Sequence, residues 1–311
     1  MKILVSDKMA QEAIDMLKDA GHEVHYEEIS PDGLLEKIGE FDGLMVRSRT
    51  KVRNDALDKA GKLKVIGRAG IGVDNINIDY AKEKGIKVVN APSGSTLSVA
   101  ELALGHMISL ARGICRGTQA TRNKEWIKKK LKGTELFGKT AGIIGCGKIG
   151  QALAERCQGL GMETVGFDPY LPADVAKEKG IELLDKEELL KRSDFISIHV
   201  ALTDSTRHMI SDDELEMMKV TSYLINCARG GVVDEEALYR ALKGEKIAGA
   251  SLDVYEEEPP GDTPLLEFDN VQFTPHIGAN TKEAQIKAGT ICAGEMMKVL
   301  NGETPDFWVN K

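Results

Sequence analysis

The sequence has no excess of cationic residues, no long apolar run and no paired cysteine motif. Acidic residues outnumber Lys and Arg by 49 to 41 among 311 residues, which gives a formal net charge of −8. This balance argues against non-specific nucleic-acid binding, which needs a cationic surface. No apolar stretch approaches the roughly 20 residues that cross a bilayer, and the N-terminal segment has a strand pattern rather than that of a signal peptide. We therefore expect a cytoplasmic protein without nucleic-acid or membrane partners.

Cysteine is scarce, and its positions favour neither disulfides nor a metal site. The five cysteines are odd in number and lack metal-ligand spacing: Cys115, Cys146, Cys157, Cys227 and Cys292. They fit a reducing compartment, in which each is expected to be a small buried hydrophobic residue. Cys227 could instead be a nucleophile, but no base stands next to it in the sequence. We expect no metal.

The remaining composition is that of a globular protein with two domains. Hydrophobic residues make up 42% and charged residues 29% of the chain, and its length allows two separate cores. The first ninety residues alternate short apolar strands, at residues 2–5, 23–26, 43–46, 64–67 and 87–89, with helical stretches at 9–20, 31–38, 53–60 and 79–84. Such alternation predicts a doubly wound parallel sheet.

A turn-rich segment at residues 91–95 ends this pattern, and a long helical segment follows. Strands are then expected at 140–144, 163–168, 195–199, 223–226, 248–253 and 271–274, with helices at 151–160, 212–218, 234–242 and 281–300. The last helix could return to the first domain. We therefore predict an α/β fold with a discontinuous first domain (residues 1–95 and 282–311) and a second domain (residues 96–281).

Three glycines follow the first strand of the second domain at the spacing of a dinucleotide-binding turn. Gly145 would permit the tight turn, Gly147 would let a pyrophosphate approach the main chain, and Gly150 would let the next helix pack on its strand. The phosphates would lie at the helix N-terminus, where free N–H groups and the helix dipole favour negative charge. The following strand ends in Asp168, about 20 residues on, where an acceptor for the ribose hydroxyls is needed. No arginine follows Asp168, so the sequence favours NAD over NADP.

Three polar residues stand just past the ends of consecutive predicted strands: Arg229, Glu258 and His276. Because parallel strands end at one edge of the sheet, these side chains should meet there. His276 could move a proton near neutral pH, Glu258 could orient the imidazole, and Arg229 could hold a carboxylate. This set is suited to hydride transfer between a nicotinamide and an alcohol or ketone.

Spacing alone leaves alternatives open. Glu258 is the last of three consecutive acids, so a solvated acidic face is a rival explanation and the choice of the third acid is uncertain. Arg229 could be an ordinary surface charge, although it stands in a Gly-rich turn. The basic run Lys128–Lys130 is typical of a solvated face, whereas the neighbouring Trp126 hints at a contact surface.

The chain resembles the D-isomer-specific 2-hydroxyacid dehydrogenases over nearly its whole length. The resemblance rests on several motifs: residues 46–52 (VRSRTKV), 67–75 (GRAGIGVDN), 98–102 (SVAEL), 145–150 (GCGKIG), 226–231 (NCARGG), 253–260 (DVYEEEPP) and 274–279 (TPHIGA). In this family the catalytic Glu immediately precedes the proline, which selects Glu258. The resemblance implies a Rossmann-type NAD domain and a flavodoxin-like substrate domain.

The resemblance also implies ligand contacts. Cofactor contacts are expected, beyond the residues above, from Lys148, Ile149, Cys227, Ala228, Asp253 and Gly278. Substrate contacts are expected from Arg229 and from the loops that contain Arg47, Ser48, Gly70 and Ile71. A basic residue of Lys128–Lys130 from a partner subunit could help hold a phosphate, because members of the family are usually dimers built through the helix after Ser95.

Within the family the chain is most similar to members that oxidise phosphoglycerate. The implied reaction is NAD-dependent oxidation of D-3-phosphoglycerate to 3-phosphohydroxypyruvate, the first step of serine biosynthesis. A glyoxylate or hydroxypyruvate reductase is the nearest rival, and a dinucleotide-sensing, corepressor-like scaffold is a third reading. Two departures stand out. Val200-Ala201 follow His199 where the family usually has Thr-Pro or a similar pair. No C-terminal regulatory domain is expected, and therefore no inhibition by serine.

Overall fold

The computed structural model describes all residues from 1 to 311 and divides them into two compact units. Unit 1 comprises Met1–Thr96 and Ala279–Lys311, and unit 2 comprises Leu97–Gly278. The boundaries expected from the sequence lie within a few residues of these limits. The assignment of unit 1 to the substrate stays a prediction.

Unit 1 contains a five-stranded sheet whose strands all run parallel. The strand order is β2-β1-β3-β4-β5, which is that of flavodoxin-like sheets. The strands are β1 (Lys2–Val5), β2 (Glu23–Tyr26), β3 (Gly43–Val46), β4 (Val65–Arg68) and β5 (Lys87–Asn90). The expectation of a doubly wound first domain is confirmed.

Helices cover both faces of this sheet because successive side chains of a strand point to opposite sides. In β1, Ile3 and Val5 join one core with α1 and α12, whereas Leu4 joins the other core with α2, α3 and α4. The helices of unit 1 are α1 (Gln11–Asp19), α2 (Pro31–Lys37), α3 (Asn54–Lys59), α4 (Ile78–Glu83) and α12 (Lys282–Leu300), with a 3₁₀ turn η1 (Ile38–Glu40).

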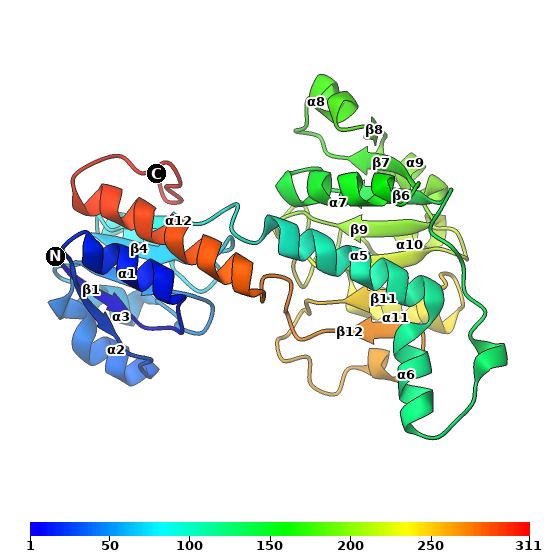
Figure 1. Cartoon of the computed structure of the whole chain (residues 1–311), viewed down its shortest axis with the longest axis horizontal. Helices are drawn as coiled ribbons and strands as arrows, with labels where there is room; N and C mark the ends of the chain where they lie inside the picture. Colours follow the sequence, from blue (N-terminus) through cyan, green and yellow to red (C-terminus); the bar gives the residue numbers. More distant parts are fainter. The chain divides into compact units, whose positions relative to one another are not determined.

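The last helix of the chain, α12, packs closely on the first unit (Figure 1). A Cβ atom at Gly67 of β4 would lie 2.3 Å from Met296 Sδ and 2.6 Å from Cys292 Sγ, both on α12. The absence of a side chain at Gly67 therefore sets how near α12 lies to the sheet. Alternating cores and this close contact make unit 1 complete only with residues from both ends of the sequence.

Unit 2 contains a seven-stranded parallel sheet in the order β12-β11-β10-β9-β6-β7-β8. The order reverses between β6 and β9, which is the switch point of a Rossmann sheet and the place where dinucleotides bind. The strands are β6 (Thr140–Ile144), β7 (Glu163–Phe167), β8 (Glu182–Leu183), β9 (Phe195–Ile198), β10 (Tyr223–Asn226), β11 (Gly249–Leu252) and β12 (Val271–Phe273).

The helices of unit 2 are α5 (Thr96–Arg112), which begins at the last residue of unit 1, α6 (Ile114–Arg122), α7 (Lys148–Gly159), α8 (Ala173–Glu178), α9 (Lys186–Arg192), α10 (Asp212–Met217) and α11 (Glu235–Lys243), with 3₁₀ turns η2 (Lys128–Lys130) and η3 (Pro264–Glu267). No single helix has the length and apolar composition of a membrane span. Helices α5 and α6 reach those values only when taken together across a 65° bend.

The sequence predicted every strand of three or more residues and missed the two-residue strand β8 and the helices α6, α8 and α9. Length alone does not explain the missed helices, because the six-residue helices α3, α4 and α10 were predicted. The helix after the glycines begins at Lys148, not at Gln151, because its first turn follows the glycine motif rather than an apolar stripe. Element types therefore follow from periodicity, while boundaries depend on local turns.

Candidate active site and cofactor loop

The glycine loop joins β6 to α7 at the switch point of the unit 2 sheet. Gly145 has φ +90°, a conformation that favours glycine, and its N–H donates to Phe167 O of β7 at 2.9 Å. A Cβ atom there would lie 2.8 Å from the carbonyl carbon and oxygen of His199, which follows β9. Gly145 thus allows the loop to pass between two strand ends.

The other two glycines differ in what surrounds them. A Cβ atom at Gly150 would lie 2.2 Å from Gly145 O, so the helix can pack on the loop only without a side chain. A Cβ atom at Gly147 would meet nothing within 4 Å, and Gly147 is the N-cap of α7 without a side-chain capping bond. The space above the helix N-terminus is therefore open to a ligand.

Asp168 lies just after β7 and ties the next loop to the glycine loop. Its Oδ2 accepts the N–H of Cys146 at 2.9 Å and its Oδ1 accepts the N–H of Tyr170 at 2.9 Å. Each carboxylate oxygen can accept more than one hydrogen bond. The carboxylate can therefore hold the loop and still accept from ribose hydroxyls.

These features fit a dinucleotide. The N-terminus of α7 presents main-chain N–H groups where the helix dipole is positive, which suits a pyrophosphate at Lys148 and Ile149. Asp168 supplies an acceptor at the end of the adjacent strand. The glycine loop, the first residues of α7 and Asp168 are thus joined at the switch point of the sheet. The other residues expected to bind the cofactor follow β10, β11 and β12.

His276 and Glu258 form a hydrogen-bonded pair at the same edge of the sheet. His276 Nδ1–H donates to Glu258 Oε2 at 2.8 Å and lies 3.1 Å from Oε1. Since a carboxylate only accepts, this contact fixes the tautomer and leaves Nε2 for a reacting group. The side chains are 49% and 40% exposed, so a small molecule can reach them. Of the three consecutive acids, Glu258 is the one that contacts His276, whereas Glu256 pairs with His208 at 3.2 Å.

The buried Asp253 holds the loop that carries His276. Its carboxylate accepts the Thr274 hydroxyl at 2.6 Å and the N–H groups of Ile277 and Gly278, each at 2.8 Å. Its main-chain oxygen accepts the N–H of His276 at 2.8 Å. His276 has φ +51°, which a non-glycine residue adopts rarely. Four hydrogen bonds to Asp253 therefore hold this loop and keep the main chain of His276 in an otherwise disfavoured conformation.

Arg229 stands in a turn after β10 that lies against the segment leading to Glu258. A Cβ atom at Gly230 would lie 1.6 Å from Tyr255 O, so this turn touches the main chain after β11. Asn226 Nδ2 donates to Arg229 O at 3.0 Å, while Asn226 Oδ1 accepts the N–H of Ala228 at 3.0 Å. All three expected catalytic residues therefore lie past the carboxyl ends of the adjacent strands β10, β11 and β12.

Neither Cys227, which is buried, nor His199, which is half-buried with its Nδ1 enclosed, is a reactive group. Burial raises the pKa of the Cys227 thiol far above its ordinary value, which keeps it protonated. Burial lowers the pKa of His199 to about 4, so its imidazole is neutral at pH 7, with Nε2 2.9 Å from Ser197 Oγ. Neither group supports nucleophilic or acid–base chemistry at this edge.

The expected substrate residues lie in unit 1, past the ends of the adjacent strands β3 and β4. Arg47 is half-buried and Ser48 exposed. A Cβ atom at Gly70 would lie 1.5 Å from Arg68 Nη1, so the Arg68 side chain passes over Gly70. Ile71 O accepts Asn90 Nδ2 at 2.7 Å, and Gly70 O accepts the N–H of Ala91 at 2.9 Å. The loop after β4 is thus anchored at the end of β5.

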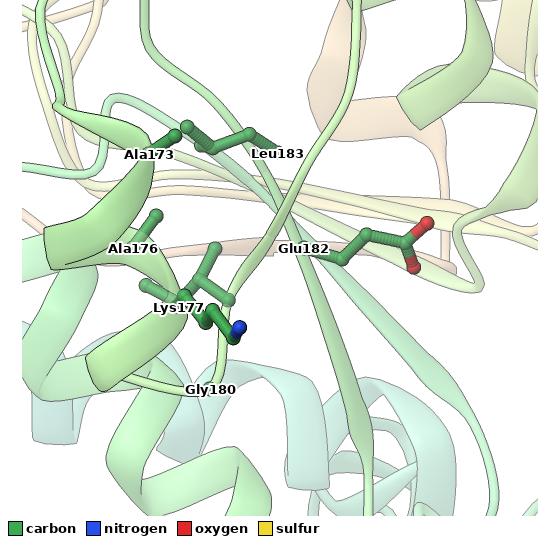
Figure 2. A pocket seen from close by; sticks show the side chains of 7 residues that line it. Ala173, Ala176, Lys177, Gly180, Glu182 and Leu183 are labelled. Carbon is green, nitrogen blue, oxygen red and sulfur yellow. The ribbon is translucent and has the colours of Figure 1, made fainter.

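A cavity of about 440 Å³ lies elsewhere in unit 2, between α8 and β8 at the sheet edge opposite β12 (Figure 2). Its lining includes Ala173, Ala176, Lys177 and Leu183. Glu182 lines it too and is held by Arg192 at 2.9 Å. None of the residues expected from the sequence to bind a ligand lines this cavity.

Residues 104–278 match the model of the D-isomer specific 2-hydroxyacid dehydrogenase family, NAD binding domain. The chain belongs to this family. Its fold agrees with solved structures: that of the TT0316 protein from Thermus thermophilus superposes with a TM-score of 0.88 at 34% identity, over 99% of this chain and 100% of that one. The seven-stranded sheet with its glycine loop is therefore the NAD-binding domain of the family.

Two curated relatives carry names that differ in substrate. A D-3-phosphoglycerate dehydrogenase of Methanocaldococcus jannaschii is 52% identical over 100% of this chain and 59% of its own length. A hydroxypyruvate reductase of Thermotoga maritima is 46% identical over 96% of this chain and 98% of its own length. The chain thus spans about three fifths of the first relative and nearly all of the second.

Several supporting residues were not singled out from the sequence. Thr274, Tyr255 and Asn226 fix the loops that carry the expected catalytic residues; for example, the Tyr255 hydroxyl donates to Thr274 O at 2.8 Å. In unit 1, Asp7 and Asn75 do the same for the Arg47 loop. The available signal was position, since Asp7 and Asn226 stand at strand ends just as Asp168 and Asp253 do.

Proposed function

We propose that this chain catalyses NAD-dependent oxidation of D-3-phosphoglycerate to 3-phosphohydroxypyruvate, the first step of serine biosynthesis. The observation that carries the proposal is the His276–Glu258 pair, 2.8 Å apart, on the sheet edge that also bears the dinucleotide loop. The name of the relative at 52% identity supports the choice of substrate.

In this mechanism His276 Nε2 takes the proton of the C2 hydroxyl. Glu258 accepts from Nδ1, keeps the imidazole oriented and stabilises the imidazolium that forms. Arg229 offers a permanent charge and a planar fork for the substrate carboxylate. NAD, when bound, supplies the hydride acceptor for C2. Asp253 acts indirectly, because it holds the loop from which His276 projects.

The phosphate would be bound by cations outside this pair. Arg47 and Ser48 at the end of β3 are the proposed residues of the same chain. The main chain of the loop that contains Gly70 and Ile71 is proposed instead to hold the substrate carboxylate together with Arg229. The exposed residues Lys128–Lys130 form the 3₁₀ turn η2 and could serve a neighbouring subunit. Lysine binds phosphate as a flexible point charge, which suits such a role.

The proposal is tested with a panel of D-3-phosphoglycerate, D-glycerate and D-lactate, each assayed with NAD and with NADP. Phosphoglycerate with NAD should give the highest kcat/KM. Arg47→Met should raise KM for phosphoglycerate without affecting unphosphorylated acids, whereas Lys62→Met, an exposed cation before β4, should change neither. Equal rates on phosphorylated and unphosphorylated acids would remove the substrate assignment.

Reduction of hydroxypyruvate or glyoxylate is the second candidate. It is favoured by one observation: the T. maritima hydroxypyruvate reductase matches over 98% of its own length. The same dyad would then give a proton to the carbonyl oxygen. Preference for hydroxypyruvate over its phosphorylated form would decide for this candidate. Retained NAD binding without turnover of any 2-hydroxy or 2-keto acid would instead indicate a sensing scaffold.

We also infer a homodimer in the cytoplasm. Support comes from large apolar side chains that stand exposed on and near α5 and α6: Leu97 is 52%, Ile114 49% and Trp126 85% exposed. A contiguous patch of such side chains marks a protein interface, whereas single exposed ones are ordinary, so the proposal requires that these residues form one surface. Light scattering of the purified chain, compared with that of Trp126→Ser, tests this assembly.

A further inference from the structure

The loop after β3, residues 47–50, contains two arginines whose guanidinium groups differ in how many hydrogen bonds they make. Arg49 is engaged on all sides: Nε donates to Asp7 Oδ1 at 3.2 Å, Nη1 to Ile29 O at 3.1 Å and Nη2 to Ser6 O at 2.5 Å. Arg47 makes a single long bond, from Nη1 to Lys8 O at 3.4 Å. Arg49 therefore braces the loop, and Arg47 keeps donors for a ligand.

Asp7 is the residue on which this division depends. It follows β1, is 2% exposed, and each carboxylate oxygen accepts two hydrogen bonds. Oδ2 accepts the N–H of Arg47 at 2.5 Å and that of Thr50 at 3.2 Å, while Oδ1 accepts the Thr50 hydroxyl at 2.6 Å and Arg49 Nε at 3.2 Å. One buried carboxylate thus satisfies donors from both ends of the loop.

The loop is held from its other side as well. Asn75 Nδ2 donates to Arg47 O at 2.8 Å and to Thr50 O at 2.7 Å. Asp7 accepts the loop's N–H groups and Asn75 donates to its carbonyl groups, so the main chain is fixed in one conformation. A side chain that binds substrate from such a loop projects from a fixed main-chain position.

We propose that Asp7 is a positioning residue for the substrate anion. It binds Arg49 as a brace and fixes the Arg47 main chain, so that the Arg47 guanidinium is presented to the substrate. This inference rests on the proposed function for the identity of the anion. The hydrogen bonds that fix the loop do not depend on that function. Asp7 itself touches no substrate in this scheme.

The chemistry of Asp7 makes the replacement by Asn informative. A carboxamide has one acceptor oxygen and one NH₂ group. Whichever way it is turned, its NH₂ would face two of the four donors that converge on Asp7. With the NH₂ at the Oδ2 position, the N–H groups of Arg47 and Thr50 would both lose their acceptor; with it at the Oδ1 position, Arg49 Nε and the Thr50 hydroxyl would lose theirs. In either orientation the loop loses part of its support, although shape and volume are nearly unchanged.

Asp42→Asn is the matched control. Asp42 precedes β3, in the same unit but at the amino ends of the strands, where its Oδ2 accepts the N–H of Lys2 at 2.8 Å and its Oδ1 lies 3.4 Å from Lys64 Nζ. Like Asp7, it accepts a hydrogen bond from a main-chain N–H group and pairs with a cationic side chain. A general loss of stability in unit 1 should appear in both variants.

A second pair of variants covers the case in which Asp7→Asn does not fold. Thr50→Val removes the hydroxyl that donates to Asp7 and keeps the shape of the side chain, whereas Thr50→Ser keeps the hydroxyl. Thr50→Ser should therefore behave like the wild type. Thr50→Val should show the Asp7→Asn effect in a weaker form.

Two measurements test the proposal. In steady-state kinetics, Asp7→Asn should raise KM for D-3-phosphoglycerate at least about tenfold, or roughly 1.4 kcal/mol, with kcat and the dissociation constant of NAD within about twofold of wild type. In hydrogen exchange, amides of residues 46–51 should exchange faster in Asp7→Asn and Thr50→Val, and not in Asp42→Asn or Thr50→Ser.

The two measurements separate this inference from the proposed function. Unchanged exchange of the loop in Asp7→Asn, or an equal KM change in Asp42→Asn, overturns the positioning role. If the wild type prefers another 2-hydroxy or 2-keto acid, the proposed substrate fails, and the KM comparison is made with that acid. Faster loop exchange with unchanged KM for the preferred acid would also overturn the inference, because the loop would then not position the anion.

Discussion

The three glycines of the cofactor loop should respond to replacement by Ala in two different ways. Gly145 and Gly150 are constrained by the protein, whereas Gly147 borders open space. At Gly145, φ +90° disfavours Ala and the new Cβ would lie 2.8 Å from the His199 carbonyl. Backbone strain and overpacking each cost about 1–3 kcal/mol, so Gly145→Ala should lose about 2–6 kcal/mol of stability.

Gly150→Ala should destabilise by overpacking alone, about 1–3 kcal/mol or more, because the contact of 2.2 Å is with the main-chain oxygen of Gly145. Gly147→Ala should change stability by no more than about 1 kcal/mol, the scale of a helix N-cap effect. Its Cβ would instead occupy the surface that a pyrophosphate needs. NAD affinity should fall at least about tenfold, or roughly 1.4 kcal/mol.

The assay is urea unfolding of the apoprotein, followed by titration of NAD by fluorescence, for all three variants. The two variants should therefore differ. Gly150→Ala should lose stability, whereas Gly147→Ala should lose only NAD affinity. If Gly147→Ala bound NAD as the wild type does, the assignment of this loop to the pyrophosphate would be refuted. If Gly147→Ala unfolded as easily as Gly145→Ala, the space above the helix would not be open.

Three further predictions concern the titratable groups of unit 2. His276→Asn should lower kcat by about 10²–10⁴ with little change in NAD affinity, since proton transfer contributes a factor of that size; stopped-flow turnover and NAD titration check both. A thiol reagent at neutral pH should modify the exposed Cys115 while the four buried cysteines react only after unfolding, because burial raises the pKa of Cys146 and Cys157 to about 12 and that of Cys227 and Cys292 further; mass spectrometry with and without urea decides this. The pKa of His199 is lowered from 6.5 to about 4, so between these pH values the folded protein binds fewer protons at this site than the unfolded chain does. The free energy of unfolding should therefore fall as the pH drops through this window, by up to about 3 kcal/mol. His199→Gln should make that fall smaller, and an unchanged pH slope in this variant would contradict the prediction.

The positions of the expected site residues could be inferred because parallel strands end at one edge. Arg229, Glu258 and His276 are remote in sequence, yet each follows a strand of the same sheet, and the sheet order places those strands side by side. Apolar periodicity marked the strands, and the glycine spacing marked the switch point. Both signals are local in the sequence.

What could not be inferred depends on contacts between distant residues. The backbone of His276 at φ +51° is set by Asp253, and nothing in Thr-Pro-His-Ile-Gly specifies that contact. Asp7 and Thr50 lie 43 residues apart, and a lone acid after a strand has many possible partners. Pattern reasoning finds which side chains bear the chemistry, and tertiary structure decides which others support them.

The return of α12 to unit 1 has a consequence for the order of events during synthesis. Unit 2 is one continuous stretch, so it can fold as soon as the chain has left the ribosome beyond Gly278, whereas β4 and its neighbours must wait for Cys292 and Met296 to cover them. The sheet of unit 1 is thus translated first but completes its folding last. Until then its apolar face is exposed to chaperones and to other nascent chains.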